Sequence, residues 1–326
     1  MKGYAAMDLR IAAFLLIGCL ASLAGAANGN KILHATAVSP HVYYFQGEAG
    51  MASASNQGFM SNAGFVVTND GVVVFDSLGS PALGASMIAA IRKVTAVPIT
   101  RVIVSHYHAD HIYGLQAFTA IGAQIWAHRN GRAYLASDVA VARLAERRIS
   151  LFPWVDADTK LVAANHWLNF SGNKVIRFVM GGIGFQLIDV SGAHSDEDIM
   201  MFVENDSVLF AGDLYFTGRI PYVGNANSRV WLTALDHMLE VKPRIVVPGH
   251  GAMSTDPASD LKLTKDYLTY LRKTMGAAVA EMTVFEEAYE TADWSKYAKY
   301  PAFAQANRLN AYGTYILMEQ ESLEKK

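Results

Sequence analysis

Residues 102–114, VIVSHYHADHIYG, place three histidines and an aspartate within six positions directly after an apolar run. The β-branched residues that come before them predict a buried strand, so the polar side chains stand where that strand ends. Because side chains two apart on an extended segment point the same way, His106 and His108 can reach one common point. Burying such a cluster is costly unless its members share a cation. The segment therefore predicts a fold in which a buried strand ends at a metal site.

Three further polar residues follow apolar strands later in the chain, His194 in SGAHSDEDI, Asp213 in LFAGD and His250 in VVPGHG. Each has a glycine close by, which is typical of a tight exit from a strand into a loop. The candidate metal ligands are therefore His106, His108, Asp110, His111, His194, Asp213 and His250.

Apolar periodicity predicts two strand-rich halves, each covered by helices. The predicted strands are 41–47, 64–68, 72–75, 99–106, 123–128, 174–180, 185–190, 199–204, 207–213 and 243–250. The predicted helices are 83–94, 110–122 and 229–241, and the pattern of 260–290 is helical as well.

Residues 151–170, between the two halves, are irregular and rich in aromatic side chains. A flexible linker is normally poorer in tryptophan, so two interpretations stay open. Either this insert packs over the core or it covers a cleft as a loop. In the second case Trp154 is a candidate substrate contact.

The first 27 residues are expected to be a signal peptide. Lys2 and Arg10 come before an apolar stretch, and Ala24 and Ala26 form a small-residue cleavage site. This pattern predicts export to the periplasm, without an integral membrane segment after cleavage. The one cysteine, Cys19, lies in LIGC, so acylation as a lipoprotein is the alternative. With no cysteine after the signal, metal ligands are nitrogen and oxygen atoms, which suit zinc and also manganese or iron.

The composition is that of an ordinary globular protein, with 17% charged residues and a formal net charge of -2. Such a balance provides no general field for attracting nucleic acid. We expect a small-molecule substrate, and the sequence leaves the oligomeric state open.

These motifs together resemble the metallo-β-lactamase fold superfamily. The signature H-x-H-x-D-H is met from His106 to His111, the later ligands follow in the family's order, and VVVFDS resembles its early motif with Asp76 as the acidic residue. The resemblance covers about residues 42–251. It implies an α+β fold, a four-layer αββα sandwich spanning 28–255, with a helical extension at 256–326 packed on it.

The resemblance also implies how two zinc ions are held. One ion would bind His106, His108 and His194, and Asp213 would bridge the two ions. Asp110, His111 and His250 would bind the other ion. A shared water would then act as a hydroxide near neutral pH. By the same resemblance Asp110 is the catalytic residue that orients this hydroxide and passes on its proton.

The substrate class is inferred from the positions at which this chain differs from individual branches of the superfamily. Asp213 stands where one group of zinc β-lactamases has cysteine, and Phe216 stands where quorum lactonases have tyrosine, with Tyr215 one residue earlier. The last histidine stands in GHGAM, where glyoxalase II usually has GHEY. The chain is similar to exported glyoxalase-II-like zinc hydrolases found beside sulfur-oxidation and quinoprotein systems. We therefore expect a thioester substrate. β-Lactam or lactone hydrolysis, and a non-catalytic zinc-binding role, are the alternatives. Asp76, Trp154 and Tyr215 are candidate supporting or substrate-contacting residues.

Overall fold

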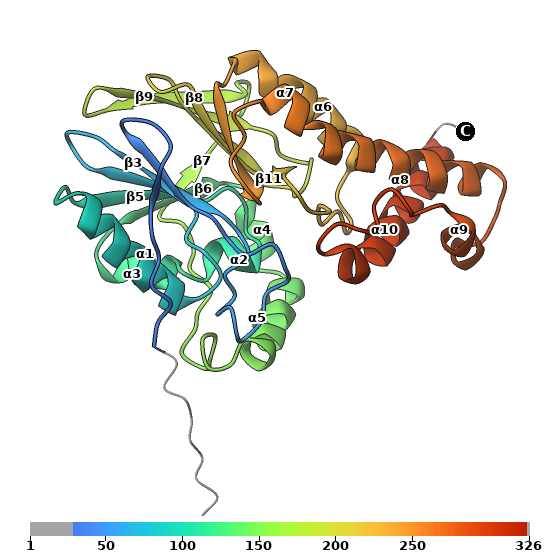
Figure 1. The fold of residues 1–326 in the computed structure, drawn as a ribbon, viewed down its shortest axis with the longest axis horizontal. Coiled ribbons are helices and arrows are strands. Elements are labelled where there is room, and N and C mark those ends of the chain that lie inside the picture. Colours follow the sequence, from blue (N-terminus) through green and yellow to red (C-terminus); the bar gives the residue numbers. More distant parts are fainter. Residues whose placement is uncertain (1–28, 325–326) are drawn as a thin grey trace, which may run out of the picture.

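The computed structural model describes residues 29–324, so the predicted signal peptide and Cys19 lie outside it. Two sheets face each other, as Figure 1 shows. The first has the strand order β1-β2-β3-β4-β5-β6-β7, antiparallel up to β4 and parallel from there. Its strands are β1 (Thr36–Ala37), β2 (Val42–Phe45), β3 (Ala63–Val67), β4 (Val72–Phe75), β5 (Ile99–Ile103), β6 (Gln124–His128) and β7 (His166–Leu168).

The second sheet has the order β12-β11-β10-β9-β8, with β11 and β12 parallel and the other pairs antiparallel. Its strands are β8 (Val175–Met180), β9 (Ile183–Asp189), β10 (Ile199–Val203), β11 (Val208–Phe216) and β12 (Ile245–His250). Both sheets thus contain parallel strands whose carboxyl ends can carry the candidate ligands.

Helices close the outer face of each sheet, which gives the four-layer sandwich expected from the sequence. The first sheet is covered by α1 (Pro81–Val94), α2 (Ala109–Ile112) and α3 (Leu115–Ala120), with α4 (Gly131–Leu135) and α5 (Asp138–Ser150) beside them. The second is covered by α6 (Ser228–Met238), the short 3-10 turn Leu239–Val241 and the start of α8 (Lys262–Ala280), which α7 (Pro257–Asp260) precedes. A third apolar cluster fills the space between the sheets, where Phe75 stacks on Phe210.

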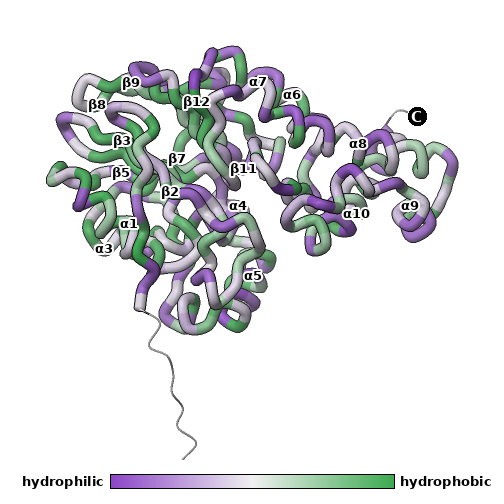
Figure 2. The backbone as a smooth tube through the Cα atoms, in the orientation of Figure 1, coloured by the Kyte–Doolittle hydropathy of each residue, from purple (hydrophilic) through white to green (hydrophobic). Residues whose placement is uncertain are grey.

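The C-terminal helices extend away from the sandwich as an arm, visible at the right of Figure 1. The arm consists of α8, α9 (Phe285–Thr291) and α10 (Phe303–Glu324). The predicted helical stretch 260–290 thus contains two separate helices, α8 and nearly all of α9, and α10 follows it. Figure 2 shows that hydrophobic residues concentrate in the strands of the sandwich, whereas the arm intersperses them with hydrophilic ones.

The predicted single helix 110–122 is wrong in one respect, because Gly114 separates α2 from α3. A side chain at Gly114 would collide with the carbonyl oxygen of Ser77, and the backbone of Gly84 on α1 lies just as close. The chain turns at this glycine because two backbones meet there. Since α2 is therefore short, the geometry of Asp110 and His111 is set by these contacts and not by helix propensity.

The aromatic insert 151–170 packs on the core and forms no lid. Its last part forms β7, which pairs with β6 at the edge of the first sheet. Val155 and Leu168 are buried, whereas Phe152 is 65% exposed to solvent. The indole of Trp154 donates to the carbonyl of Ala54. Among residues 29–324, no helix combines the length and apolar character needed to cross a bilayer.

The insert generates a stability prediction. Leu168→Ala should lower the free energy of unfolding by about 2–5 kcal/mol, because it removes a buried side chain between the layers. Phe152→Ala, in the same segment but exposed, should change it by less than about 0.5 kcal/mol. Urea unfolding of both variants tests this, and equal midpoints would contradict the core position of the insert.

Candidate metal centre

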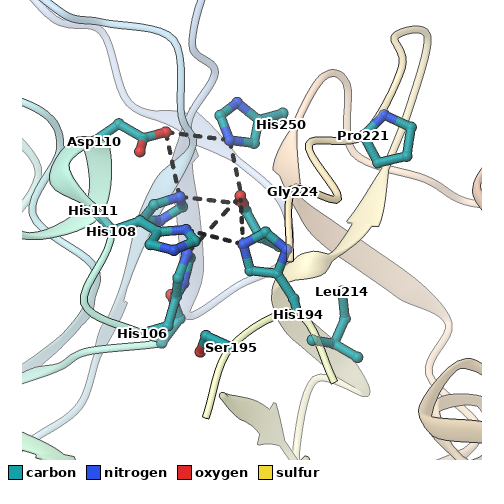
Figure 3. Close-up of polar contacts among 12 residues, drawn as sticks. His106, His108, Asp110, His111, His194, Ser195, Leu214, Pro221, Gly224 and His250 are labelled. Carbon is teal, nitrogen blue, oxygen red and sulfur yellow. Dashed lines mark hydrogen bonds and ion pairs between the residues drawn. The ribbon is translucent and has the colours of Figure 1, made fainter. Parts of the chain in front are cut away.

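The seven candidate ligands converge at one end of the sandwich, although they come from both sheets (Figure 3). They form two groups whose ligand atoms lie within 4.8 Å of one another. The first group consists of His106, His108, His194 and Asp213, and the second of Asp110, His111 and His250. This division is the one that the sequence resemblance implies.

The carboxylate of Asp213 lies between the two groups. Its Oδ2 is 3.6 Å from Nε2 of His194 and 4.0 Å from Nε2 of His106. Its Oδ1 is 3.2 Å from Nε2 of His111 and 3.3 Å from Nε2 of His250. Each oxygen therefore faces a different set of imidazoles, which is the geometry of a bridging ligand.

Asp110 completes the second group from α2. Its Oδ2 lies 3.3 Å from Nε2 of His250 and 3.5 Å from Nε2 of His111. On the other side of Asp213, Nε2 of His194 is 3.0 Å from Nδ1 of His108. His108 thus presents Nδ1 to the cluster, whereas the other imidazoles present Nε2.

Strand irregularity brings Asp213 into this position. The pairing of β11 with β12 shifts register between Phe210 and Gly212 and again before Phe216, so the strand bulges where the aspartate stands. Gly212 has a positive φ of 54°. Gly249 on β12 leaves room for the carboxylate, because a side chain there would overlap Oδ1 of Asp213.

Asp76, predicted as a supporting residue, orients two of the imidazoles. Its Oδ2 lies 2.8 Å from Nδ1 of His111 and accepts from the hydroxyl of Ser105 at 2.8 Å. Its Oδ1 accepts from the amide of Ser105 at 2.7 Å, and that hydroxyl lies 2.9 Å from Nδ1 of His106. Asp76 has a φ of 61°, a strained backbone that aims its carboxylate at these partners.

Other supporting residues were missed from the sequence. His250 is oriented by the carbonyl of Met60, 2.7 Å from its Nδ1, and the buried Arg219 lies 3.3 Å from the same nitrogen. The loop that presents His194 is fixed by Asp198, which accepts from the amide and hydroxyl of Ser195. Of these supporting residues, only Ser195 and Asp198 carried a recognisable sequence signal, a serine followed three residues later by an aspartate.

Burial and mutual charge interactions strongly shift the pKa values of the side chains in the cluster. Burial alone would raise the pKa of Asp213, but the charges of His250 and His111 outweigh it and hold this pKa well below its usual range. Burial lowers the pKa of His194 to about 3. For His111, burial opposes the charged form, yet Asp213, Asp110 and Asp76 raise the pKa well above its usual value. The carboxylates thus favour positive charge at the centre of the cluster.

A divalent cation fits these residues. Several buried ligand atoms have no hydrogen-bond partner within the described part of the chain, namely Nε2 of His106, Oδ2 of Asp110, Nε2 of His111 and Oδ1 of Asp213. Such atoms are costly to bury unless a cation binds them. The donor set is nitrogen and oxygen without sulfur, as expected for zinc, with manganese and iron also suited.

A cavity of about 420 Å³ opens beside His108 and His194. One wall is the loop 192–197, and the opposite wall is the loop 222–227. Tyr222 on the second loop has its ring 6.4 Å from that of His108. A cavity of about 540 Å³, lined by His41, Asn69 and Asn205, shares no residue with this cluster, so we assign substrate binding to the smaller one.

Two predicted residues are not brought to the cluster. Trp154 is absent from the lining of the cavity and donates instead to Ala54, because the insert is used for core contacts. Tyr215 is fully buried in the apolar cluster between β11 and the C-terminal helices. The register shift before Phe216 breaks the strict alternation that would have placed Tyr215 on the side of Asp213.

Comparison with known proteins agrees with this architecture. Residues 56–250 match the family model described as the Metallo-beta-lactamase superfamily. The metallo-β-lactamase type 2 of Bacillus sp. (strain 170) is 29% identical over 213 residues, covering 64% of this chain and 70% of that protein. The enzyme of the same name from Bacillus cereus is 28% identical over 213 residues, with the same coverage of both chains.

Solved structures share the fold at lower identity. A stereoselective inverting sec-alkylsulfatase from Pseudomonas sp. superposes with a TM-score of 0.67 at 16% identity, over 88% of this chain and 50% of its own. The chain thus spans half the length of that sulfatase, and coverage this wide must reach beyond residue 255. A metallo-β-lactamase from Pontibacter korlensis gives a TM-score of 0.55 at 18% identity, over 73% of this chain and 99% of its own.

The matched segment holds all seven candidate ligands, and the two sheets with their helices have the architecture that the motif implied. The chain therefore belongs to the metallo-β-lactamase superfamily of hydrolases.

Proposed function

We propose that this protein is a binuclear zinc hydrolase that cleaves activated carbonyl compounds, with thioesters as the preferred class. The observation that carries the proposal is the position of Asp213, whose two carboxylate oxygens face different groups of imidazoles at 3.2 to 4.0 Å. A carboxylate with this geometry can hold two cations side by side. The expected ligands are the seven residues of the cluster.

Two zinc ions bound here would supply Lewis acidity and make water a nucleophile near neutral pH. The protein would contribute position and proton transfer. One oxygen of Asp110 faces His111 and His250, which leaves the other to orient a water and carry its proton. Asp76 holds His111 and, through Ser105, His106 in fixed orientations, so the ligands are preorganised.

The charge of the cavity bears on the substrate. Among the described residues that line it there is no lysine or arginine, whereas Asp196 and Glu197 are both present. The exposed Arg143 on α5 acts on Tyr134 and His108 by its charge but does not line the cavity. Apart from the proposed zinc ions, a substrate carboxylate thus finds no cationic partner in the lining. This favours the thioester of a neutral thiol over a glutathione thioester or a carboxylate-bearing β-lactam.

β-Lactam hydrolysis is the second candidate, because the two Bacillus relatives carry that name over most of the matched segment. A lactonase is less well supported. Phe216 stands where a tyrosine hydroxyl would be expected, and its ring stacks on His250 at 5.1 Å without offering a hydrogen bond.

Metal content tests the binuclear centre. The mature chain reconstituted with zinc should hold about two equivalents. Asp213→Asn should hold less than about one and lose at least ~100-fold in kcat/KM, because the bridge serves both ions. Asp206→Asn is the matched control, since Asp206 is also buried and pairs with His41 at the turn before β11. A wild-type chain that saturates at one equivalent would contradict the proposal.

A substrate panel at fixed zinc tests the chemistry. Its members are an N-acetylcysteamine thioester, a glutathione thioester, a short acyl lactone, a chromogenic cephalosporin and an aryl phosphodiester. We expect the neutral thioester to give the highest kcat/KM, because a thiolate leaves without prior protonation and the described lining of the cavity has no basic side chain to pair with a carboxylate. A cephalosporin faster by tenfold, about 1.4 kcal/mol of transition-state preference, would replace this proposal with a β-lactamase. No turnover of any member would indicate a non-catalytic zinc protein.

Glu197 generates a pH prediction. Burial raises the pKa of this carboxyl from 4.5 to about 7. The folded state then holds its proton more tightly than the unfolded state, so the contribution to stability is complete below pH 4.5 and is lost as the pH rises through 7. Glu197→Gln should therefore reduce the fall in unfolding free energy between pH 5 and pH 8, by an amount on the order of 2 kcal/mol. Urea unfolding at the two pH values measures it. Asp196→Asn, an exposed neighbour whose charge adds to the effect of burial on Glu197, should keep most of the wild-type fall.

A further inference from the structure

The loop between β11 and α6 forms one wall of the cavity. Tyr222, Val223, Asn225, Ala226 and Asn227 all line it. Figure 3 draws Pro221 and Gly224 from this loop on the side of His194, away from Asp110 and His111. Its conformation therefore decides how closely a substrate can approach the cluster.

One asparagine on the C-terminal helix α10, Asn310, binds three backbone groups of this loop. The side-chain oxygen of Asn310 accepts from the amides of Val223 and Gly224, at 2.8 and 3.2 Å. Its side-chain nitrogen donates to the carbonyl of Pro221 at 2.8 Å. Asn310 is fully buried, so these bonds have no competition from solvent.

Asn310 also has a partner within the arm. Its side-chain nitrogen also donates to the hydroxyl of Tyr267 on α8 at 3.0 Å, and that hydroxyl donates to Asn307 at 2.8 Å. One turn further along α10, a side chain at Gly313 would overlap the carbonyl oxygen of Gly224. Loop and helix are thus in direct backbone contact. A second bond runs from the amide of Ile220 to the carbonyl of Pro301.

We propose that Asn310 is a positioning residue for substrate binding, through which the C-terminal arm sets the shape of the cavity wall. The arm contributes no lining residue and no candidate ligand, yet the wall opposite the His194 loop depends on it. Loss of Asn310 leaves the buried amide of Val223, the partly buried amide of Gly224 and the carbonyl of Pro221 without these partners, and the loop will move to recover them. Substrate affinity should fall while the metal ligands stay in place. The role of Asn310 in substrate binding rests on the proposed function, whereas its effect on the loop conformation does not.

The experiment compares three variants of the full zinc-loaded chain. Asn310→Ala removes the bonds, and Gly313→Ala displaces the loop by contact while Asn310 remains. Asn307→Ala is the matched control, a fully buried asparagine on the same helix with no bond to the loop or to Asn310 itself. It removes the acceptor of the Tyr267 hydroxyl, but that hydroxyl can still accept from Asn310. For the best substrate of the panel, Asn310→Ala and Gly313→Ala should raise KM about tenfold with kcat changed less than about threefold. Zinc content should stay at the wild-type level, and Asn307→Ala should keep the wild-type KM.

Hydrogen–deuterium exchange gives a readout that needs no substrate. The amides of Val223 and Gly224 should lose protection in Asn310→Ala but keep it in Asn307→Ala, while the segment around His194 stays protected in both. Equal KM values, or equal protection of the loop, in the two asparagine variants would overturn the proposal. If Asn310→Ala does not fold, Gly313→Ala measured against Asn307→Ala decides by the same criteria. If no panel member is hydrolysed, the proposed function fails, and exchange still decides whether Asn310 holds the loop.

Discussion

The buried carboxylate of Asp213 is the constraint around which the rest of the molecule is arranged. Four imidazoles lie within 4.0 Å of its two oxygens, on two sides, and nearly all of these groups are shielded from water. Such an assembly is unfavourable unless positive charge sits within it. Without metal, the carboxylates raise the proton affinity of His111 and His250, while burial lowers that of His106 and His194. The two ligand groups, here called half-sites, therefore differ in ionisation: the half-site with His111 and His250 favours protonated imidazoles, and the one with His106 and His194 favours neutral imidazoles.

The positions of the ligands could be predicted because they follow from local sequence. A β-branched run followed by histidines identifies a buried strand and its polar exit, as at His106 and His250. Asp76 was found in the same way, by its place after VVVF. The break at Gly114 was not predicted, because it depends on the backbones of Ser77 and Gly84 from other segments. The spacing of apolar residues in a helix carries no information about close contacts with backbones from other segments.

The residues around the candidate ligands were harder to find for a related reason. Arg219 and Asn310 stand in no motif, and Glu197 lies in SGAHSDEDI without a sign of its role. Their roles come from partners more than 30 residues away, such as His250 for Arg219 and Tyr107 for Glu197. The aromatic insert is the opposite case. Its aromatic residues left two interpretations open, packing on the core or covering a cleft. The structure supports the first, because β7 adds the insert to the edge of the first sheet and its apolar residues belong to the core.

The contact between Asn310 and the loop has a consequence for the order in which a ribosome completes this molecule. Every candidate ligand has been synthesised by residue 250, so both half-sites exist on the nascent chain before the arm does. The cavity wall at Pro221–Gly224 receives its hydrogen bonds only after another 60 residues have been added. A chain clipped within the arm would thus retain all seven candidate ligands and lose the hydrogen bonds that position the cavity wall. The candidate metal centre and the support of its cavity wall are encoded in successive segments of the gene.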